Sequence, residues 1–357
     1  MVTTGLAGGG SEYTVCAAIA NLFRDIVLPD EMPVSKLFLI SCVVLGMAAA
    51  AVAADDFPQA EIGNGLVNAK LYLPDPDRGY YRGTRFDWSG VIPSLEFKGH
   101  QYFGQWFERY DPKLHDAIMG PVEEYRTNDA GLGYDEAKPG GTFIRIGVGT
   151  VRKPDEPSYQ AFKTYEIVDS GKWSTREGAD WIEFTHVLKD DSGYAYLYKK
   201  TIRLVKGKPE MTIEHSLKNT GSKLIRTAQY NHNFFVIDNQ TTGPDMVIQF
   251  PFEPKPTKDL KGLAQVTGKD LMYTQALEKG QSVFTELEGF GASASDYDLR
   301  IENRKSGAGV RIRGDRPLVK MVFWSIRTTA CPEPYIQIEV APGREEKWKF
   351  TYDFYTL

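Results

Sequence analysis

The fold of this chain is decided by residues 181–221, which read WIEFTHVLKDDSGYAYLYKKTIRLVKGKPEMTIEHSLKNTG. Apolar and polar residues alternate over 181–188, 194–204 and 211–217, which is the pattern of strands with one buried face. Turn residues separate the three segments, Asp-Asp-Ser-Gly at 190–193 and Lys-Gly-Lys-Pro at 206–209. The stretch therefore predicts consecutive antiparallel strands with no helix between them.

The same pattern continues on both sides of this stretch, from about Asn64 to the C-terminus. Further alternating segments lie at 246–250, 299–302, 310–313, 318–326, 336–340 and 348–354. The least strand-like segment is 257–280, where we expect a short helix. Many closely spaced strands without helices indicate an antiparallel sandwich or barrel. Since no Gly/Ser-rich linker divides them, we predict an all-β fold, with 54–357 as a single large antiparallel β-sandwich domain.

The N-terminal segment has the layout of an export signal. Residues 1–31 are Gly-rich and acidic, whereas Met32 and Lys36 precede an apolar run that ends in Ala51-Val52-Ala53. A short basic start, an apolar middle and an Ala-x-Ala end are typical of secretory signals. We therefore interpret 32–53 as a signal peptide, 1–31 as a non-native upstream extension, and the mature protein as periplasmic or secreted.

Two alternatives to simple export remain for this segment. A membrane anchor is one, but the apolar run is at the lower limit of a spanning length and ends in alanines. The other is lipidation, because Leu39-Ile40-Ser41-Cys42 resembles a bacterial lipoprotein cleavage box. We expect no stable membrane insertion after processing and keep the lipoprotein as a minor alternative.

Composition excludes several classes of function. The chain of 357 residues has 42 Lys and Arg against 47 Asp and Glu, a formal charge of −5, so it offers no cationic field for a nucleic acid or an anionic membrane. Cleavage after Ala53 would leave Cys331 without a disulfide partner. No His or Cys residues have the spacing of a zinc or non-haem iron site, and we expect neither metal nor cofactor.

Glu333 and His232 are the candidate catalytic residues. Glu333 stands between Pro332 and Pro334, which predicts a stiff, non-helical connection at the mouth of a strand. His232 lies in Tyr-Asn-His-Asn-Phe-Phe, residues 230–235, at the end of a predicted strand. Histidine exchanges a proton near neutral pH, and an acid and a base on separate strand ends suit proton transfer across a small substrate. The alternative for Glu333 is a solvated glutamate in a Pro-rich turn.

Four other histidines have simpler explanations. His186 and His215 are in phase with the apolar residues of their segments, which favours core histidines, although the same face can floor a binding cleft. His100 and His115 flank an aromatic-rich stretch without metal-ligand spacing. None of the four is a candidate catalytic group.

Residues 230–235 resemble the Asn-His-x-Tyr-Phe motif of the aldose 1-epimerase (galactose mutarotase-like) superfamily. Three other segments are similar to this family in the same order: 82–86 to its early arginine stretch, 211–221 to a strand ending in an Asn-Thr-Gly turn, and 333–345 to its C-terminal glutamate segment and Pro-Gly-Glu turn. The resemblance extends from about Asn64 to the C-terminus.

This resemblance implies a β-supersandwich that binds a sugar in a cleft on a concave sheet. It implies His232 as the general acid, which protonates the ring oxygen, and Glu333 as the general base, which removes the anomeric hydroxyl proton. Arg85 would bind sugar hydroxyls, and no cofactor would be required because only protons move. Further expected substrate-binding residues are Asn231, Glu123, Glu124 and Trp88, although Trp88 could equally be a core aromatic.

The chain departs from the family at one position. Met119 stands where the family usually supplies a second active-site histidine. Glu123 or Glu124 could contact the sugar instead. We therefore expect an exported aldose 1-epimerase-like protein that interconverts sugar anomers. The alternatives are a non-catalytic carbohydrate-binding protein of the same fold and a lyase or hydrolase accessory domain.

Overall fold

Residues 181–221 form three consecutive antiparallel strands, as predicted: β10 (Trp181–Lys189), β11 (Ala195–Leu204) and β12 (Glu210–Asn219). The structure is a computed structural model that describes residues 57–357, and these form one compact unit. The upstream extension and signal peptide predicted for residues 1–53 lie outside the described residues. Among residues 57–357, no helix is long and apolar enough to span a bilayer.

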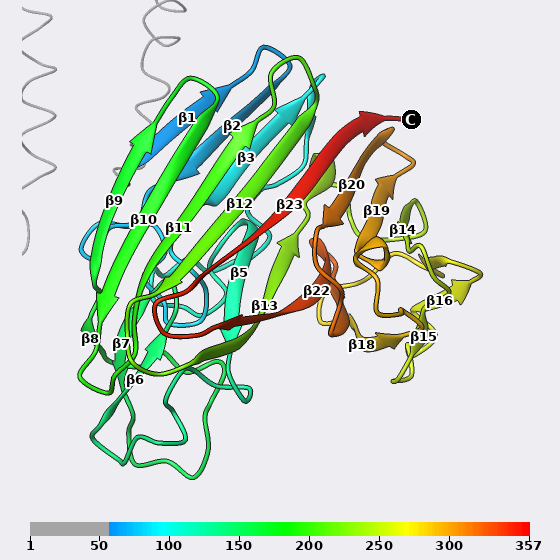
Figure 1. Cartoon of the computed structure of the whole chain (residues 1–357). Helices are drawn as coiled ribbons and strands as arrows, with labels where there is room; N and C mark the ends of the chain where they lie inside the picture. Colours follow the sequence, from blue (N-terminus) through cyan, green and yellow to red (C-terminus); the bar gives the residue numbers. More distant parts are fainter. Residues whose placement is uncertain (1–56) are drawn as a thin grey trace, which may run out of the picture. The chain divides into compact units, whose positions relative to one another are not determined.

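The described residues form four antiparallel sheets (Figure 1). The ten-stranded sheet has the order β16 (Ala264–Thr267), β17 (Asp270–Tyr273), β14 (Met246–Gln249), β19 (Asp298–Asn303), β20 (Ala308–Gly314), β23 (Glu345–Thr356), β12, β11, β10 and β9 (Lys172–Glu177). The six-stranded sheet has the order β15 (Lys255–Pro256), β18 (Ser282–Glu288), β21 (Lys320–Ile326), β22 (Thr329–Val340), β13 (Ile225–Phe234) and β5 (Gly120–Arg126).

Two small sheets and two 3-10 turns complete the fold. The first small sheet has β1 (Gln59–Gly63), β2 (Val67–Tyr72), β3 (Val91–Phe97) and β4 (His100–Gln101), and the second has β6 (Thr142–Arg145), β7 (Gly149–Arg152) and β8 (Ile167–Asp169). The 3-10 turns are η1 (Ile237–Asn239) and η2 (Ala294–Asp296). The predicted all-β sandwich is confirmed.

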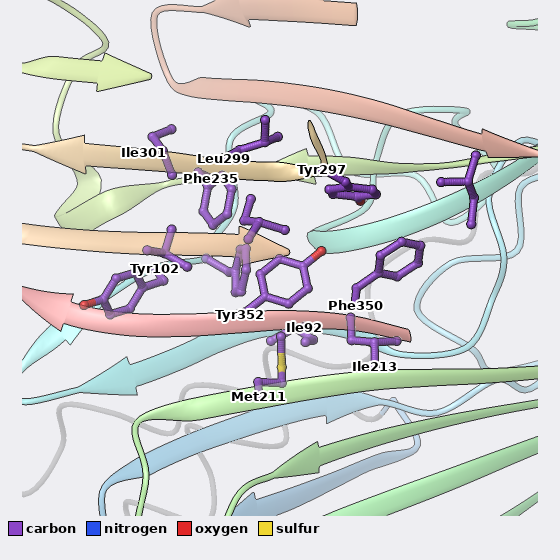
Figure 2. Packing of buried hydrophobic residues seen from close by; sticks show 14 of the residues in the cluster. Ile92, Tyr102, Met211, Ile213, Phe235, Tyr297, Leu299, Ile301, Phe350 and Tyr352 are labelled. Carbon is purple, nitrogen blue, oxygen red and sulfur yellow. The ribbon is translucent and has the colours of Figure 1, made fainter. Parts of the chain in front are cut away.

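The main core lies between the two large sheets. Ile213 of β12 and Phe350 of β23 belong to the same buried cluster as Ile336 and Ile338 of β22, and Figure 2 shows Ile213 and Phe350 with their neighbours in this cluster. A second cluster covers the opposite face of the six-stranded sheet and includes Phe234 of β13. The six-stranded sheet is therefore buried on both faces, and the two faces hold different sets of side chains.

The prediction of a short helix within 257–280 is wrong. This segment forms the hairpin of β16 and β17, in which Thr267 pairs with Asp270. Gly268 lies at the turn with φ +60°, a backbone conformation that glycine adopts without strain. The hairpin adds two strands to the end of the ten-stranded sheet, so pairing with β14 overrides the weak local pattern.

The segment around Glu333 also differs from the prediction, because it lies inside β22 and not at a strand mouth. Pro332 and Pro334 pair in register with β21, but the ladder between β22 and β13 ends at the Tyr335–Tyr230 pair. Proline cannot donate to a ladder, so it is tolerated where pairing is interrupted. Instead, the Asn233 side-chain amide donates to the Pro332 carbonyl at 2.8 Å.

Candidate active site

The candidate site lies on the face of the six-stranded sheet that points away from the ten-stranded sheet. Side chains alternate between faces along a strand, and registered partners share a face. On β13 this face carries Ala228, Tyr230, His232 and Phe234, the last three of which belong to the second buried cluster or contact it. We call it the outer face and the opposite one the inner face.

His232 and Glu333 are in direct contact on the outer face. The His232 Nε2 and Glu333 Oε1 atoms lie 3.3 Å apart, and the two side chains are only 6% and 7% exposed. The His232 ring stacks on Phe234 at 3.9 Å between centroids, and the edges of Phe86 and Trp324 approach it at 5.7 Å. An aromatic enclosure thus removes most water from the pair.

Burial shifts the pKa values of Glu333 and His232 in opposite directions. Desolvation raises the pKa of Glu333 to about 8, with Arg85 offsetting part of the rise. Desolvation, and then the positive charge of Arg85, hold the pKa of His232 well below its ordinary value. At neutral pH the Glu333 carboxyl is therefore protonated and the His232 imidazole is neutral.

Arg85 is fixed beside the pair by several partners. Its Nε donates to Glu124 Oε2 at 3.1 Å, its Nη2 donates to the Tyr230 hydroxyl at 3.2 Å, and its Nη1 donates to Asp116. The guanidinium also lies over the rings of Phe86 and Phe162, 4.5 and 5.1 Å from their centroids. Phe86 in turn contacts His232, so Arg85 connects the enclosed pair with the more exposed Phe162.

Glu124 lies on the outer face, where it forms ion pairs with arginine side chains. Arg145 Nη2 donates to its Oε1 at 2.8 Å, and the Tyr230 hydroxyl donates to its Oε2. Burial opposes ionisation, but Arg145, Arg85 and Arg126 together lower the pKa of Glu124 to about 2. Glu124 is thus ionised throughout the neutral range and holds Arg85 in place.

Glu123 and Asn231 lie on the inner face and are not brought to the pair. Glu123 forms a buried ion pair with Lys200 and accepts from His215 Nε2 at 3.1 Å. The Asn231 amide donates to the Tyr352 hydroxyl of β23 at 3.0 Å. Both residues therefore join the two large sheets, and a direct sugar contact for either stays a prediction.

Trp88 and Met119 are buried in the second cluster, together with Phe86 and Phe234. The Trp88 Nε1 donates to the Gly83 carbonyl at 2.8 Å, and its ring stacks on Trp173 at 6.5 Å. The geometry gives Trp88 a packing role, and a role in sugar binding remains a prediction.

Several residues next to the pair were not identified from the sequence as site residues. Asp116 bonds Arg85 and lies 3.0 Å from His115 Nε2. Phe162 is 63% exposed, and its ring centroid lies 5.0 Å from that of His115. Tyr230 could have been found, because it is two residues from His232 on the same face, but the Phe162 segment has no periodic signal. Among residues 57–357, no group of three His, Cys, Asp or Glu side chains could hold a metal ion.

Solved structures similar to this chain share its architecture. An aldose epimerase homologue from C. elegans has a TM-score of 0.53 at 14% identity, covering 85% of this chain and 100% of its own. A galactose mutarotase-like protein from Clostridium acetobutylicum has a TM-score of 0.52 at 13% identity, covering 84% and 95%. One from Lactobacillus casei has a TM-score of 0.53 at 12% identity, covering 83% and 100%.

The chain has the galactose mutarotase-like fold. No family model matches the sequence, and no curated protein matches it. At identities of 12–14% the galactose mutarotase-like fold is what the likeness shows, and one fold can host many activities. The chemistry of the site must therefore be argued from its own side chains.

Proposed function

We propose that this protein interconverts the anomers of an aldose by general acid/base catalysis at His232 and Glu333. The supporting observation is their 3.3 Å contact in a nearly dry enclosure. Proton affinities shifted by burial are typical of catalytic groups, because they place an acid and a base of suitable strength side by side. The names of the structural neighbours, aldose epimerase and galactose mutarotase-like, agree with a sugar ligand.

The proposed reaction needs one proton on the pair. Ring opening requires an acid that protonates the ring oxygen and a base that takes the anomeric hydroxyl proton. Both oxygens are bonded to the same carbon, so two adjacent groups can reach them. In the unliganded protein the proton resides on Glu333, so Glu333 can act as the acid and His232 as the base. If a bound sugar moves the proton within the pair, the roles become those expected from the family resemblance. Reclosure on either face of the aldehyde returns each proton.

Two further features support a bound sugar at the pair. The Nδ1 atom of His232 is buried without a hydrogen-bond partner among residues 57–357, and such an atom costs free energy unless a polar group meets it. Arg85, which is held by Glu124, is a fixed cation near the pair. A sugar hydroxyl would give the Nδ1 atom its partner.

Polarimetry on freshly dissolved α-D-glucose and α-D-galactose tests this proposal. Wild-type protein should speed mutarotation, and Glu333→Gln should lower the rate by a factor of about 10²–10⁴ while retaining sugar binding. The wild-type rate should follow a bell-shaped pH profile that reports the pair. Its upper limb should lie near pH 8, where Glu333 loses its proton. Equal rates for wild type and Glu333→Gln would contradict the assignment.

A non-catalytic carbohydrate-binding protein is the second candidate. It is favoured by Met119, a buried apolar side chain at the position of the second family histidine. In that case no common aldose would be mutarotated, a glycan would still bind, and Glu333→Gln would leave its affinity unchanged.

Export is proposed as well, and it rests on the sequence pattern of residues 32–53 alone. N-terminal sequencing of the natural protein should find a start near Ala54 or Asp55. An intact N-terminus at residue 1 or 2 on protein from the cytoplasm would exclude export.

A further inference from the structure

A cleft of about 490 Å³ opens on the outer face of the six-stranded sheet. We call it the Ala228 cleft and define it by Arg126, Ala228, Lys320, Tyr335 and Gln337. These residues come from four adjacent strands, β5, β13, β21 and β22. The same four strands surround the His232–Glu333 pair.

The register places the cleft directly beside the pair. Tyr335 pairs with Tyr230, and the next residues on the same face, Gln337 and Ala228, also pair. Glu333 precedes Tyr335 by two residues, so its row is adjacent. Two residues along a strand span about 7 Å. Along β22, Tyr335 therefore lies roughly 7 Å beyond Glu333, and Gln337 lies roughly 7 Å beyond Tyr335.

Tyr335 links the cleft to the pair through its contact with Tyr230. Their rings stack at 4.2 Å with an angle of 13°. Tyr335 lines the cleft, while the Tyr230 hydroxyl accepts from Arg85. A ligand that occupies the cleft therefore touches Tyr335, whose ring stacks on Tyr230 beside His232.

We propose that the Ala228 cleft binds the second glycosyl unit of a neutral oligosaccharide whose terminal sugar lies at the His232–Glu333 pair. The proposal deepens the proposed function and rests on it for the placement of the terminal sugar. The substrate class is then a short sugar chain and not a free monosaccharide alone.

The size of the cleft and its mixture of polar and apolar side chains suit a sugar ring. Its volume lies within the usual range for small-molecule pockets, about 300–1,000 Å³. The small side chain of Ala228 forms the floor between its partners Gln337 and Arg126. Leu224 and Val319 line the cleft and are 38% and 49% exposed, so they offer apolar surface to the C–H face of a ring.

The charges favour a neutral ligand over an acidic one. Lys320 Nζ lies 2.8 Å from Glu286, and Arg226 Nε lies 2.7 Å from Glu339. The third cation of the lining, Arg126, has its Nη2 at 3.6 Å from Asp129. Since each cation has a carboxylate partner, a uronate or sulfate group would have to compete with that partner.

The test is calorimetric titration of the full-length protein with mono-, di- and trisaccharides of glucose, galactose and mannose. Polarimetry is carried out on the same sugars. Ala228→Trp fills the cleft, and Ala292→Trp is the matched control, because Ala292 is exposed and outside the cleft lining. Wild type and Ala292→Trp should bind a disaccharide about tenfold more tightly than its monosaccharide. Ala228→Trp should lose this gain. A galacturonate disaccharide should bind no better than the neutral one.

The outcomes separate this proposal from the proposed function. Mutarotation that depends on Glu333, with equal affinity for one and two units, would leave the function standing and overturn the cleft proposal. Affinity that depends on chain length and on Ala228, without mutarotation, would support the cleft in a binding protein. A gain in disaccharide affinity that survives in Ala228→Trp would also overturn the cleft proposal. Circular dichroism checks that the Ala228→Trp variant is folded.

Discussion

Two buried clusters of charged side chains lie on opposite sides of the six-stranded sheet, and each combines a glutamate, a histidine and a cation. The inner cluster contains Glu123, His215, Lys200 and Asp87. The outer cluster contains Glu124, His232, Arg85 and Glu333. Glu123 and Glu124 are sequence neighbours, so strand alternation alone assigns them to different environments.

In the inner cluster the Glu123 carboxylate is paired with Lys200 and His215, although the His215 Nδ1 atom has no hydrogen-bond partner among residues 57–357. Lys200 and Glu123 have side chains with no exposed surface, and Lys200 donates to Ser89 as well. Burial would raise the pKa of Glu123, but Lys200 and His215 lower it. In the outer cluster Glu333 contacts the neutral His232, and a cleft opens in the adjacent rows of the sheet. The two buried carboxylates thus differ in charge compensation, because Glu123 contacts Lys200 whereas Glu333 contacts the neutral His232.

The largest difference between the two clusters should appear in the mutarotation rate when one histidine from each is replaced. His232→Asn should lower the rate of mutarotation by about 10²–10⁴-fold, because it removes one proton carrier. The double variant with Glu333→Gln should be little worse, since residues that act as a unit are not additive. His215→Asn is the control, and its folded fraction should retain turnover. Equal losses of turnover in His232→Asn and His215→Asn would contradict the assignment of catalysis to the outer cluster alone.

Lys200→Met should destabilise the fold by about 3–5 kcal/mol, because it leaves the buried carboxylate of Glu123 without its main counter-charge. Urea denaturation followed by tryptophan fluorescence measures this loss. Adding Glu123→Gln should restore part of it, since no buried charge is then left unpaired. A change below 1 kcal/mol on its own would mean that the inner cluster is not structural.

The clusters should also affect stability in different pH windows. The pKa of Glu333 is raised from 4.5 to about 8 and that of Asp87 from 3.8 to about 6, in both cases chiefly by desolvation. The folded protein keeps each proton after the unfolded chain has lost it. Each contribution to stability is therefore complete below the lower value and is lost as pH rises to the upper one, with a slope of at most about 1.4 kcal/mol per pH unit.

Denaturation between pH 4 and 9 separates the two overlapping windows. Glu333→Gln should remove the fall in stability between pH 6 and 8, and Asp87→Asn should make the fall between pH 4 and 6 shallower without changing the fall between pH 6 and 8. A fall between pH 6 and 8 that persists in Glu333→Gln would assign that titration to another group.

Phe162→Ala should give the smallest effect. Its ring lies over Arg85 at the exposed end of the outer cluster, where it can meet the apolar face of a sugar. Aromatic contacts contribute about 0.5–1.5 kcal/mol, so KM should rise by about 2- to 10-fold with kcat unchanged. Phe284→Ala is the matched control, because Phe284 is also exposed and lies under a cation, Lys258. An unchanged KM in Phe162→Ala would leave the ring without a role in binding.

The sequence predicted the parts of the fold that depend on local alternation. The strands of 181–221 were found because their buried faces repeat every two residues. The hairpin at 264–273 was missed, because pairing with β14 decides it. Glu333 was identified as a candidate, but its place inside β22 follows from a broken ladder that no local pattern encodes. Which of Glu123 and Glu124 faces outward, and the position of Phe162, depend on tertiary packing.

The interruption between β13 and β22 has a mechanical consequence. The ladder is closed at Tyr230–Tyr335 and again at the Phe235–Ala330 bridge, and His232 and Glu333 lie between these two points. Their strands are held from the far sides by β5 and β21. Small backbone rotations can therefore change the separation of His232 and Glu333 without breaking a ladder hydrogen bond. Across the interruption the Asn233 amide donates to the Pro332 carbonyl, so a ligand that parts the pair would act against this side-chain bond and not against a ladder.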